Sequence, residues 1–515
     1  MRRFVALSVT VLVGLSCGGV VLHAADNCGY ATPESQGVDS VTLDKWVAEL
    51  GKLRYIHGFV VRRHGFIIAE GSWKPFDTLR ECHMLYSHSK SFTSTAVGFL
   101  VDDGRLDLDE CVVDILPEKA PPKERQSENL RKVRVRDLLT MNAGTSDDVN
   151  LMTPEGDWIK AFFDGDFAIA PGTRFAYSTI STHVLAAIVE KRSNCDLMTF
   201  LKRRLFDKIG IRDAWTTYSP TGVAVGGSGM RMTTRDLSLF GQFYLQEGMW
   251  DGERLLSKEW IRLATSRQSW SRGGIRLLHL VEQGGDWEQG YGFQFWRCRH
   301  DSYRADGALG QLTLVIPKAD MVISINAGGG GFQTMLDMVW NILLPGVKET
   351  ALFENARACA ALRERCASLS ISTVFGGREG AERFYGKKIY FEENPRGFRS
   401  VHLGESDGKW QLSLQVRGPE KTFAVGKDCW SEGHCVIDPE PDVESWCRIN
   451  GVQKICSSGA VQPNGDFVVI SFLTETPARI FLRFYETNGV QKVKGDFSSM
   501  GGCSIVGEER KETSE

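Results

Sequence analysis

The sequence has little of several features that would assign a function from composition alone. Its formal net charge is only −3, from 61 basic and 64 acidic side chains, so the chain offers no broad positive field for nucleic-acid binding. Beyond its first residues it has no run of about 20 apolar residues, and we expect no transmembrane segment in the mature chain. With 42% hydrophobic and 24% charged residues, it is globular rather than disordered, collagen-like or coiled-coil. Any function must therefore reside in a local site.

Signatures of metal sites and disulfide scaffolds are also sparse. Thirteen cysteines among 515 residues are too few for a disulfide scaffold. No CxxC, HExxH or EF-hand pattern occurs, and the ten histidines have no ligand spacing, so we expect no metal and no cofactor. In an oxidising compartment, bridges are expected within one cluster of cysteines: Cys429, Cys435, Cys447 and Cys456.

The first 24 residues have the pattern of a secretory signal peptide. Two arginines at positions 2 and 3 precede the mostly apolar residues 4–15, and the small residue Ala24 lies at the expected cleavage site. We therefore predict that residues 1–24 are removed and that the protein is exported to the periplasm or outside the cell. A lipoprotein attached through Cys17 is the disfavoured alternative, because Gly14 stands where such signals usually have leucine.

Strand patterns lie at both ends of residues 25–346, and helical patterns lie between them. A hairpin is predicted over residues 59–69, and residues 85–265 are mostly helical in pattern. Further strands are predicted at residues 291–296, 312–316 and 321–325. This order predicts an α/β (α+β) fold, in which an antiparallel sheet is closed by distant segments, flanked by helices and interrupted by a helical subdomain.

The rest of the chain has a different pattern. Residues 347–373 are typical of a helical connector. After Phe375 the sequence changes to short alternating strands separated by Gly, Asn and Asp turns. We therefore predict a C-terminal all-β domain over residues 374–515, with a disordered tail that begins at Glu508.

The segment Ser87-His88-Ser89-Lys90 carries the strongest chemical signal. It opens a nearly apolar helical pattern, so its first turn is expected at the base of a cleft, where backbone N–H groups and the helix dipole face Ser87. Lys90, three residues on, projects over the same face. A cation and N–H donors are what a serine nucleophile needs. The alternative is that Ser87 only caps the helix and Lys90 is a surface charge, because an isolated S-x-x-K pattern is weak.

Other serine and glycine patterns are weaker. Residues 14–18 and 404–408 match G-x-S-x-G, but the first lies in the signal peptide and the second in a polar turn without the helix that a nucleophile elbow requires. Residues 328–331 resemble a phosphate loop but lack its Gly-Lys-Ser/Thr ending, so a structural turn is predicted. His88, beside Ser87, is expected to form a pocket wall rather than act as a base.

Four motifs together resemble one family: residues 86–94, 135–144, 171–178 and 229–237. Their order and spacing are similar to those of the serine β-lactamase and penicillin-binding protein superfamily. The resemblance is closest to its class C-like branch, which includes esterases, D-amino-peptidases and 6-aminohexanoate-dimer hydrolases. It implies the β-lactamase-like, or transpeptidase, fold.

The resemblance implies a role for several individual residues. Ser87 would be the acylated nucleophile, Lys90 its activating partner, and Tyr177, the tyrosine of a Y-x-N motif, the general base and then the general acid. The N–H groups of Ser87 and Ala308 would form the oxyanion hole. The substrate would also contact Thr179, which stands at the Asn of Y-x-N, and the third motif, which here consists of Ala305, Asp306 and Gly307.

The third motif departs from the family pattern, which is K/H-S/T-G. Gly307 keeps the glycine that a close backbone approach needs, but Ala305 replaces the cation and Asp306 the hydroxyl. We expect Asp306 to repel an anionic substrate, and Arg304 to point away from it because side chains alternate along a strand. As a counterpart of the deacylating Glu of class A enzymes, Glu155 is only a weak candidate.

These residues predict an exported serine hydrolase that forms an acyl-enzyme with a small-molecule or peptide-like ester or amide. Because the third motif is altered, a carboxylesterase or amidase is favoured over a β-lactamase or a D-alanyl-D-alanine carboxypeptidase. A catalytically weakened binding or sensor protein of the same fold is a second alternative. The sequence identifies neither the substrate nor the oligomeric state. Four tryptophans could line the cleft or pack in the core: Trp158, Trp270, Trp287 and Trp296.

Overall fold

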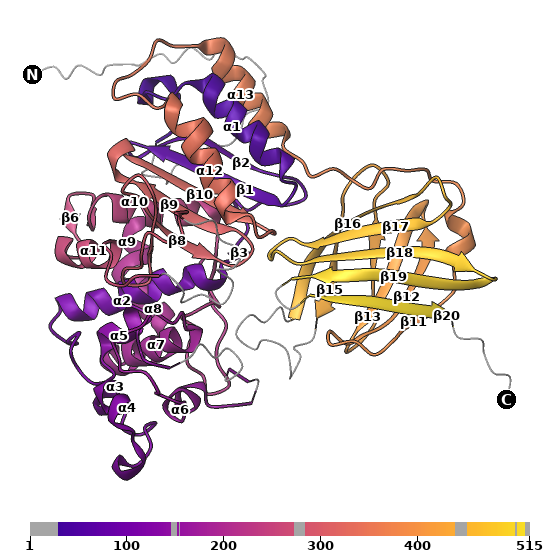
Figure 1. The fold of residues 1–515 in the computed structure, drawn as a ribbon. Coiled ribbons are helices and arrows are strands. Elements are labelled where there is room, and N and C mark those ends of the chain that lie inside the picture. The colour runs from indigo at the N-terminus through magenta and orange to yellow at the C-terminus, as the bar shows by residue number, and fades with distance from the viewer. Residues whose placement is uncertain are drawn as a thin grey trace, which may run out of the picture.

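The computed structural model describes residues 29–145, 152–153, 155–271, 284–437, 451–499 and 502–509. The signal peptide predicted over residues 1–24, including Cys17, lies outside these residues. The described chain forms two parts, a mixed part of sheet and helices followed by an all-β part (Figure 1). Within the described residues, no helix is long and apolar enough to cross a membrane.

A six-stranded antiparallel sheet forms the centre of the first part. Its order is β2 (Phe66–Ser72), β1 (Ile56–Arg63), β10 (Met321–Ala327), β9 (Gln311–Ile316), β8 (Tyr303–Gly307) and β7 (Trp296–Arg297). His64 and Gly65 join β1 to β2, and their positive φ angles of 49° and 84° suit a tight hairpin turn. β1 pairs with β10, which lies more than 250 residues away in sequence, with Phe59 opposite Ile325. The predicted closure of the sheet by distant segments is therefore confirmed.

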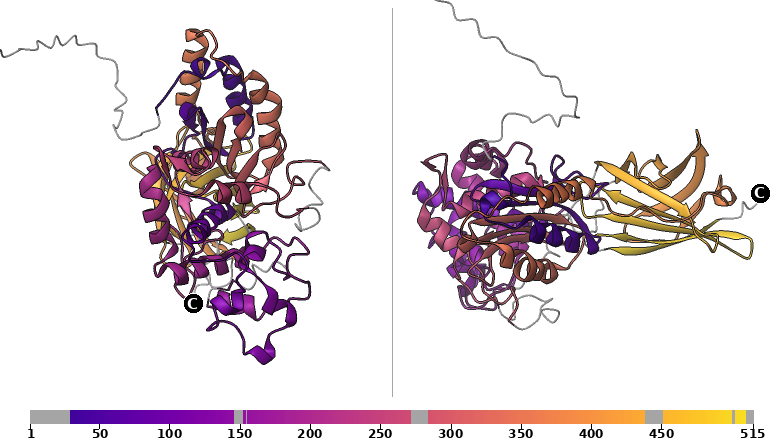
Figure 2. Two further views of the ribbon diagram at one scale, coloured as in Figure 1. Left: turned by 90° about the vertical axis from the view of Figure 1, so that its left-hand side faces the viewer. Right: turned by 90° about the horizontal axis from the view of Figure 1, so that it is seen from above.

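Helices cover both faces of this sheet (Figures 1 and 2). One face packs against α1 (Ser40–Lys52), α12 (Phe332–Met338) and α13 (Ala356–Ser368). The other face packs against α2 (Ser89–Asp102) and α10 (Thr234–Leu245). The remaining helices on this side are α3 (Val112–Ile115), α4 (Glu128–Lys132), α5 (Val135–Leu139), α6 (Trp158–Phe163), α7 (Thr179–Ser193), α8 (Leu197–Leu201), α9 (Asp207–Ile209) and α11 (Lys258–Thr265). Two small ribbons add β3 (His83–Met84) paired with β4 (Arg231–Met232), and β5 (Met249–Trp250) paired with β6 (Glu253–Arg254).

The strand predicted over residues 291–296 is wrong, because only Trp296 of this segment belongs to a strand. Gln294 interrupts it with a φ of 65°. The side-chain amide of Gln294 is buried, where it donates to the carbonyls of Leu138 and Leu139 and accepts from the Thr182 hydroxyl at 2.8 Å. The chain therefore bends around a buried hydrogen-bonding side chain, which the aromatic-rich sequence pattern did not reveal.

The C-terminal part is a ten-stranded antiparallel sheet that curves into a near-barrel, so the predicted all-β domain is confirmed. Its strands are β11 (Ile389–Phe391), β12 (Phe398–Ser406), β13 (Lys409–Val416), β14 (Lys421–Val425), β15 (Ser431–Ile437), β16 (Gly451–Val461), β17 (Phe467–Leu473), β18 (Arg479–Thr487), β19 (Val490–Ser498) and β20 (Cys503–Glu509), in the order β14-β13-β12-β11-β20-β19-β18-β17-β16-β15. Aromatic side chains such as Trp410 and Phe467 pack in its interior. Of residues 404–408, predicted to form a polar turn, only Asp407 and Gly408 form the β12–β13 turn, whereas residues 404–406 belong to β12. The predicted disordered tail does not begin at Glu508, because Glu508 and Glu509 belong to β20 and pair with β11.

The predicted disulfide cluster is wrong for the cysteines that the structure describes. Cys429, Cys435 and Cys456 are all free thiols. In the β15–β16 pair, Cys435 lies opposite Gln453 and Cys456 opposite Glu432, so the register does not place two cysteines across from each other. Cys447 lies outside the described residues.

The β domain contacts the segment that leads into Ser87. The turn between β17 and β18 contributes the Glu475 carbonyl, which accepts from the Met84 N–H at 3.0 Å. Beside it, the rings of His83 and His57 are joined by a contact of 3.0 Å between His57 Nδ1 and His83 Nε2. Both histidines are buried, and Phe472 of β17 packs against His57. The two parts therefore share a buried interface next to the candidate nucleophile.

Acid is expected to destabilise the protein partly through this interface. Burial lowers the pKa of His83 to about 3, whereas an unfolded chain has a histidine pKa of about 6.5. Between these values the unfolded chain binds a proton that the folded chain does not. The free energy of unfolding therefore decreases as pH falls from about 6.5 toward 3, by up to about 1.4 kcal/mol per pH unit for one such group. Urea unfolding at several pH values should show a smaller slope in His83→Gln than in the wild type.

The control for this prediction is His64→Gln. His64 is exposed and its ring contacts the Gln36 side chain at 3.0 Å, so the variant removes a histidine without removing a buried one. It should keep the wild-type slope. An unchanged slope in His83→Gln would contradict the prediction.

Candidate active site

The candidate nucleophile lies in a tight turn between a short strand and a buried helix. β3 runs into a 3₁₀ turn, Tyr86–His88, and α2 begins only at Ser89, so Ser87 lies just before the helix rather than within it. The His88 N–H donates to the Leu85 carbonyl at 3.2 Å and so closes the turn. Tyr86 has a positive φ of 47°, which a non-glycine residue holds only where its surroundings enforce it. The turn leaves Ser87 half-buried between buried neighbours.

The Lys90 side chain is buried and forms a hydrogen bond with Ser87. It is only 1% exposed, so the alternative of a surface charge is wrong. Nζ donates to Ser87 Oγ at 3.0 Å, to Thr179 Oγ1 at 3.2 Å and to the Gly227 carbonyl at 2.7 Å. An ammonium has three N–H donors, and these three acceptors fix its orientation. A buried cation therefore contacts the hydroxyl that would have to lose its proton.

Tyr177 and Thr179 reach the site from the start of α7. Ser178, between them, caps this helix by accepting from the Ser181 N–H at 3.2 Å. The Tyr177 ring centre lies 4.9 Å from Lys90 Nζ, and the same ring stacks on Trp296, with ring centres 5.8 Å apart and planes at 19°. The structure thus brings Ser87, Lys90, Tyr177 and Thr179 together, although 90 residues separate the first from the third in sequence.

Gly307 lets β8 lie directly against the nucleophile turn. A Cβ at this position would be 1.9 Å from the Leu85 carbonyl oxygen and 2.9 Å from the His88 nitrogen, so any other residue would push the strand away. Ala308, the next residue, is half-buried beside the turn. The side chain of Ala305 instead packs in the core on the α2 side of the sheet, away from the face that carries Asp306.

Arg304 does not point away from Asp306 as predicted. Its Nε donates to Asp306 Oδ2 at 2.7 Å, because residues two apart on a strand share a face. Arg304 is fully buried, and its guanidinium lies 4.4 Å from the Trp287 ring centre and 5.6 Å from that of Trp296. Burial raises the pKa of the Asp306 carboxyl, whereas Arg304 and the Lys90 ammonium oppose that rise. The predicted repulsion of anionic substrates by Asp306 is therefore countered by a buried cation.

Comparisons with known proteins relate this chain to one family. A family model described as beta-lactamase matches residues 43–340, more than half of the chain. The chain belongs to the beta-lactamase family. The 6-aminohexanoate-dimer hydrolase of Paenarthrobacter ureafaciens is 28% identical over 288 residues, which cover 52% of this chain and 70% of that protein. Penicillin-binding protein 4 of Amycolatopsis lactamdurans is 26% identical over 280 residues, 47% of this chain and 71% of that one. The solved structure of an octameric penicillin-binding protein homologue from Pyrococcus abyssi is 16% identical and covers 91% of this chain and 100% of that chain, with a TM-score of 0.47.

Two other residues considered in the sequence analysis, His88 and Glu155, have no part in this site. His88 is fully buried and its Nε2 contacts Thr313 Oγ1 at 2.8 Å. Burial lowers the pKa of His88 to about 3, so it is a neutral core residue, neither a base nor a pocket wall. Glu155 is exposed, and among the described residues no contact joins it to Ser87 or Lys90.

An aromatic wall beside Tyr177 was only partly foreseen. Trp296 and Trp287 belong to it, whereas Trp158 packs in the helical core and Trp270 is 57% exposed. The wall also includes Phe175 and Tyr291, together with Met141. No local motif marks these residues, because three separate segments meet only in the fold. The Gly227 carbonyl was also missed, since a backbone acceptor leaves no side-chain signal.

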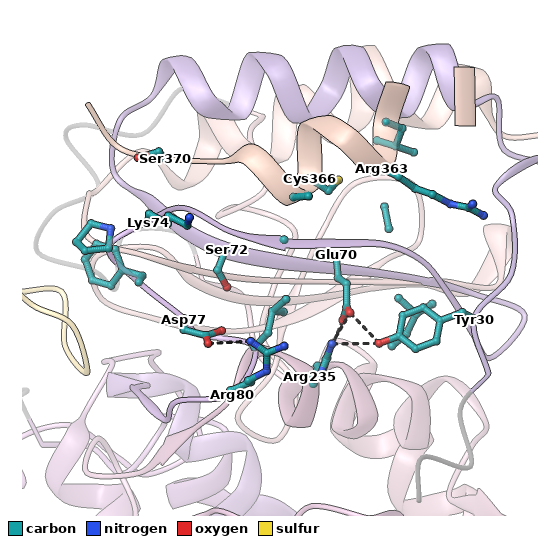
Figure 3. A pocket seen from close by; sticks show the side chains of 18 of the residues that line it. Tyr30, Glu70, Ser72, Lys74, Asp77, Arg80, Arg235, Arg363, Cys366 and Ser370 are labelled. Carbon is teal, nitrogen blue, oxygen red and sulfur yellow. Dashed lines mark hydrogen bonds and ion pairs between the residues drawn. The ribbon is translucent and has the colours of Figure 1, made fainter. Parts of the chain in front are cut away.

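A cavity of about 1140 Å³ runs along β2 and is lined also by α13 and by the loop around Trp430 (Figure 3). It includes none of the candidate catalytic residues, so it is not the site of the chemistry considered above. Within the described residues, no group of three or more His, Cys, Asp or Glu side chains could hold a metal ion.

Proposed function

We propose that this protein is a serine hydrolase that forms an acyl-enzyme through Ser87 with an ester or amide substrate. The observation that carries the proposal is the buried Lys90 ammonium, 3.0 Å from Ser87 Oγ and 4.9 Å from the centre of the Tyr177 ring. Membership of the beta-lactamase family supports it. Export, predicted from residues 1–24, is part of the same proposal.

The proposed reaction has two halves. Ser87 Oγ attacks the substrate carbonyl carbon as its proton passes to Tyr177, whose phenolate form the adjacent Lys90 ammonium stabilises. The N–H groups of Ser87 and Ala308 stabilise the oxyanion. Collapse breaks the bond to the alcohol or amine, which leaves with the proton from Tyr177. Water then attacks the acyl-enzyme along the same path and releases the acid and Ser87.

The surroundings of Tyr177 favour an apolar group on the substrate. Trp296 stacks on Tyr177 and Tyr291 meets it edge-on, with ring centres 6.3 Å apart, and apolar or aromatic substrate groups gain most from such a wall. A carboxylesterase or amidase therefore remains the preferred function. One observation supports a β-lactamase or a D-alanyl-D-alanine carboxypeptidase as the second candidate, because Arg304 balances the charge of Asp306.

Covalent labelling tests the proposal. A fluorophosphonate probe should add once per chain, on the peptide that contains Ser87, and Ser87→Ala should remain unlabelled by intact-protein mass spectrometry. Ser406→Ala is the matched control, since Ser406 is exposed at the end of β12 within a segment that also matches G-x-S-x-G, and it should label fully. Labelling of Ser87→Ala at the wild-type rate would refute the proposal.

Turnover separates the alternatives. Short p-nitrophenyl esters, D-amino-acid amides and nitrocefin should be compared on wild type and Ser87→Ala, and we expect the esters to be hydrolysed fastest. Continuous release after the first equivalent of p-nitrophenol indicates an enzyme. A burst of one equivalent that then stops would instead support the binding or sensor protein.

A further inference from the structure

The cavity along β2 is a groove at the edge of the central sheet. β2 is the outermost strand on that side, and its residues from Ile67 to Ser72 all line the groove. In Figure 3, Cys366 and Arg363 of α13 lie above this strand, whereas Arg80 and Arg235 lie below it. The groove measures about 1140 Å³, which is large enough for a short peptide in extended conformation.

The backbone of β2 presents hydrogen-bonding groups to this groove. The Trp73 N–H donates to the His57 carbonyl of β1 at 2.8 Å, and pairing alternates along an antiparallel strand. The backbone N–H and C=O groups of Gly71, which lies opposite Phe59, therefore also point toward β1. It follows that the N–H and C=O groups of Glu70 and Ser72 point outward, away from β1 and into the groove.

Both ends of this edge already accept another segment of the chain. At one end the Ile67 N–H donates to the Gly29 carbonyl at 3.1 Å, and at the other the Lys74 N–H donates to the Leu369 carbonyl at 3.1 Å. Both segments run parallel to β2. Among the described residues, no backbone partner faces Glu70 or Ser72 on this side. A sheet edge of this kind is a template for an added strand.

The charged residues that line the groove indicate which charge a bound peptide strand should carry. Its four carboxylates all have cation partners: Glu70 with Arg235, Asp77 with Arg80, Asp428 with Lys427, and Glu432 with Lys454. Lys74 and Arg363 also line the groove and are exposed, yet neither has a carboxylate partner among the described residues. Two uncompensated positive charges therefore flank the free edge, while Leu362 and Cys366 offer an apolar surface above it.

We propose that the outer edge of β2 binds an extended acidic peptide segment of a partner protein. The segment adds as a strand that exchanges main-chain hydrogen bonds with Glu70 and Ser72, and its acidic side chains pair with Lys74 and Arg363. The part of the edge between its two occupied ends runs from Ile68 to Trp73, roughly 20 Å of extended chain, and the segment would lie there. This interaction surface is separate from Ser87 and does not depend on the proposed hydrolase activity.

Peptide binding to the full chain tests this inference. The probe is a fluorescein-labelled heptapeptide of alternating valine and glutamate, followed by fluorescence anisotropy, with a valine–lysine peptide as its counterpart. We expect the acidic peptide to bind at least ten times more tightly than the basic one, and its affinity to fall with added salt. Equal binding of both peptides, or no binding of either at millimolar concentration, would overturn the inference.

Variants separate the backbone and charge contributions. Ser72→Pro removes the outward N–H, which an edge strand tolerates, and should weaken binding at least tenfold, whereas Ser72→Ala should not. The double variant Lys74→Glu/Arg363→Glu should have a similar effect, and Lys258→Glu/Lys318→Glu, a reversal of two exposed lysines outside the groove, should have none. If Ser72→Pro does not fold, the charge variants still decide, because unchanged affinity in Lys74→Glu/Arg363→Glu contradicts the proposal. Amide exchange should slow at Glu70 and Ser72 in the complex.

Discussion

Lys90→Met is expected to lower kcat/KM for a p-nitrophenyl ester by about 10³-fold, the effect of losing a positioned group that activates a nucleophile. Methionine has a similar length and no charge, so it fills the buried space without holding Ser87 Oγ. The change also leaves the Gly227 carbonyl, an acceptor at 2.7 Å in the wild type, without its donor. We therefore expect moderate destabilisation, of about 1–3 kcal/mol, together with the loss of rate.

The control for this prediction is Lys119→Met. Lys119 pairs with Asp157 at 2.6 Å in the helical region, so the same substitution there removes a partly buried ammonium that has no part in the proposed reaction. It should keep wild-type kinetics. If Lys90→Met retained more than a tenth of wild-type kcat/KM in a folded protein, Lys90 would have no role in activating Ser87.

The variant Tyr177→Phe tests whether Tyr177 and Lys90 act together in the proton transfer. If Lys90 and Tyr177 act as one proton-transfer unit, the double variant Lys90→Met/Tyr177→Phe should be no slower than the slower single variant, since residues that act together are not additive. Independent roles would instead multiply the two losses. Steady-state kinetics of the four proteins, with thermal unfolding as the folding control, distinguish these outcomes.

The parts of the fold that local patterns control were the easiest to predict. The β1–β2 hairpin follows from the short apolar runs on either side of residues 62–65, and the buried helix after Ser87 follows from its apolar composition. The family motifs added the proximity of Ser87, Lys90 and Tyr177, which no local pattern contains. By contrast, the bend at Gln294 depends on acceptors more than 150 residues away, so the apolar pattern around it indicated a strand wrongly.

The error at Arg304 had a different cause. Strand alternation places Arg304 and Asp306 on one face and Ala305 on the other. The periodicity therefore predicts that Arg304 points toward Asp306, but it was applied as if these two residues were adjacent. The depth of the Arg304–Asp306 pair was not accessible from sequence, because Trp287 and Asp286 reach Arg304 from a separate loop. This pair changes the chemical meaning of the third motif. An acidic residue next to the nucleophile no longer implies a site that excludes anions.

Gly307→Ala is expected to lower kcat by about 10²-fold with little change in KM, the typical effect of losing one oxyanion donor. The added Cβ would lie 1.9 Å from the Leu85 carbonyl oxygen. That oxygen belongs to the backbone of the nucleophile turn, so a side chain cannot rotate to relieve the clash. β8 must move outward, which takes the N–H of Ala308 away from Ser87, whereas the substrate surfaces formed by Tyr177 and Trp296 stay in place.

Gly330→Ala is the matched control, because a Cβ at Gly330 meets no atom within 4 Å. It should keep wild-type kcat and thermal stability. Fluorophosphonate labelling should slow in Gly307→Ala by a factor similar to kcat, since the phosphonyl oxygen needs the same two N–H donors as an ester oxyanion. If Gly307→Ala folded normally and kept wild-type rates with both reagents, the Ala308 N–H would not belong to the oxyanion hole. The donor that joins Ser87 would then have to come from another part of the turn.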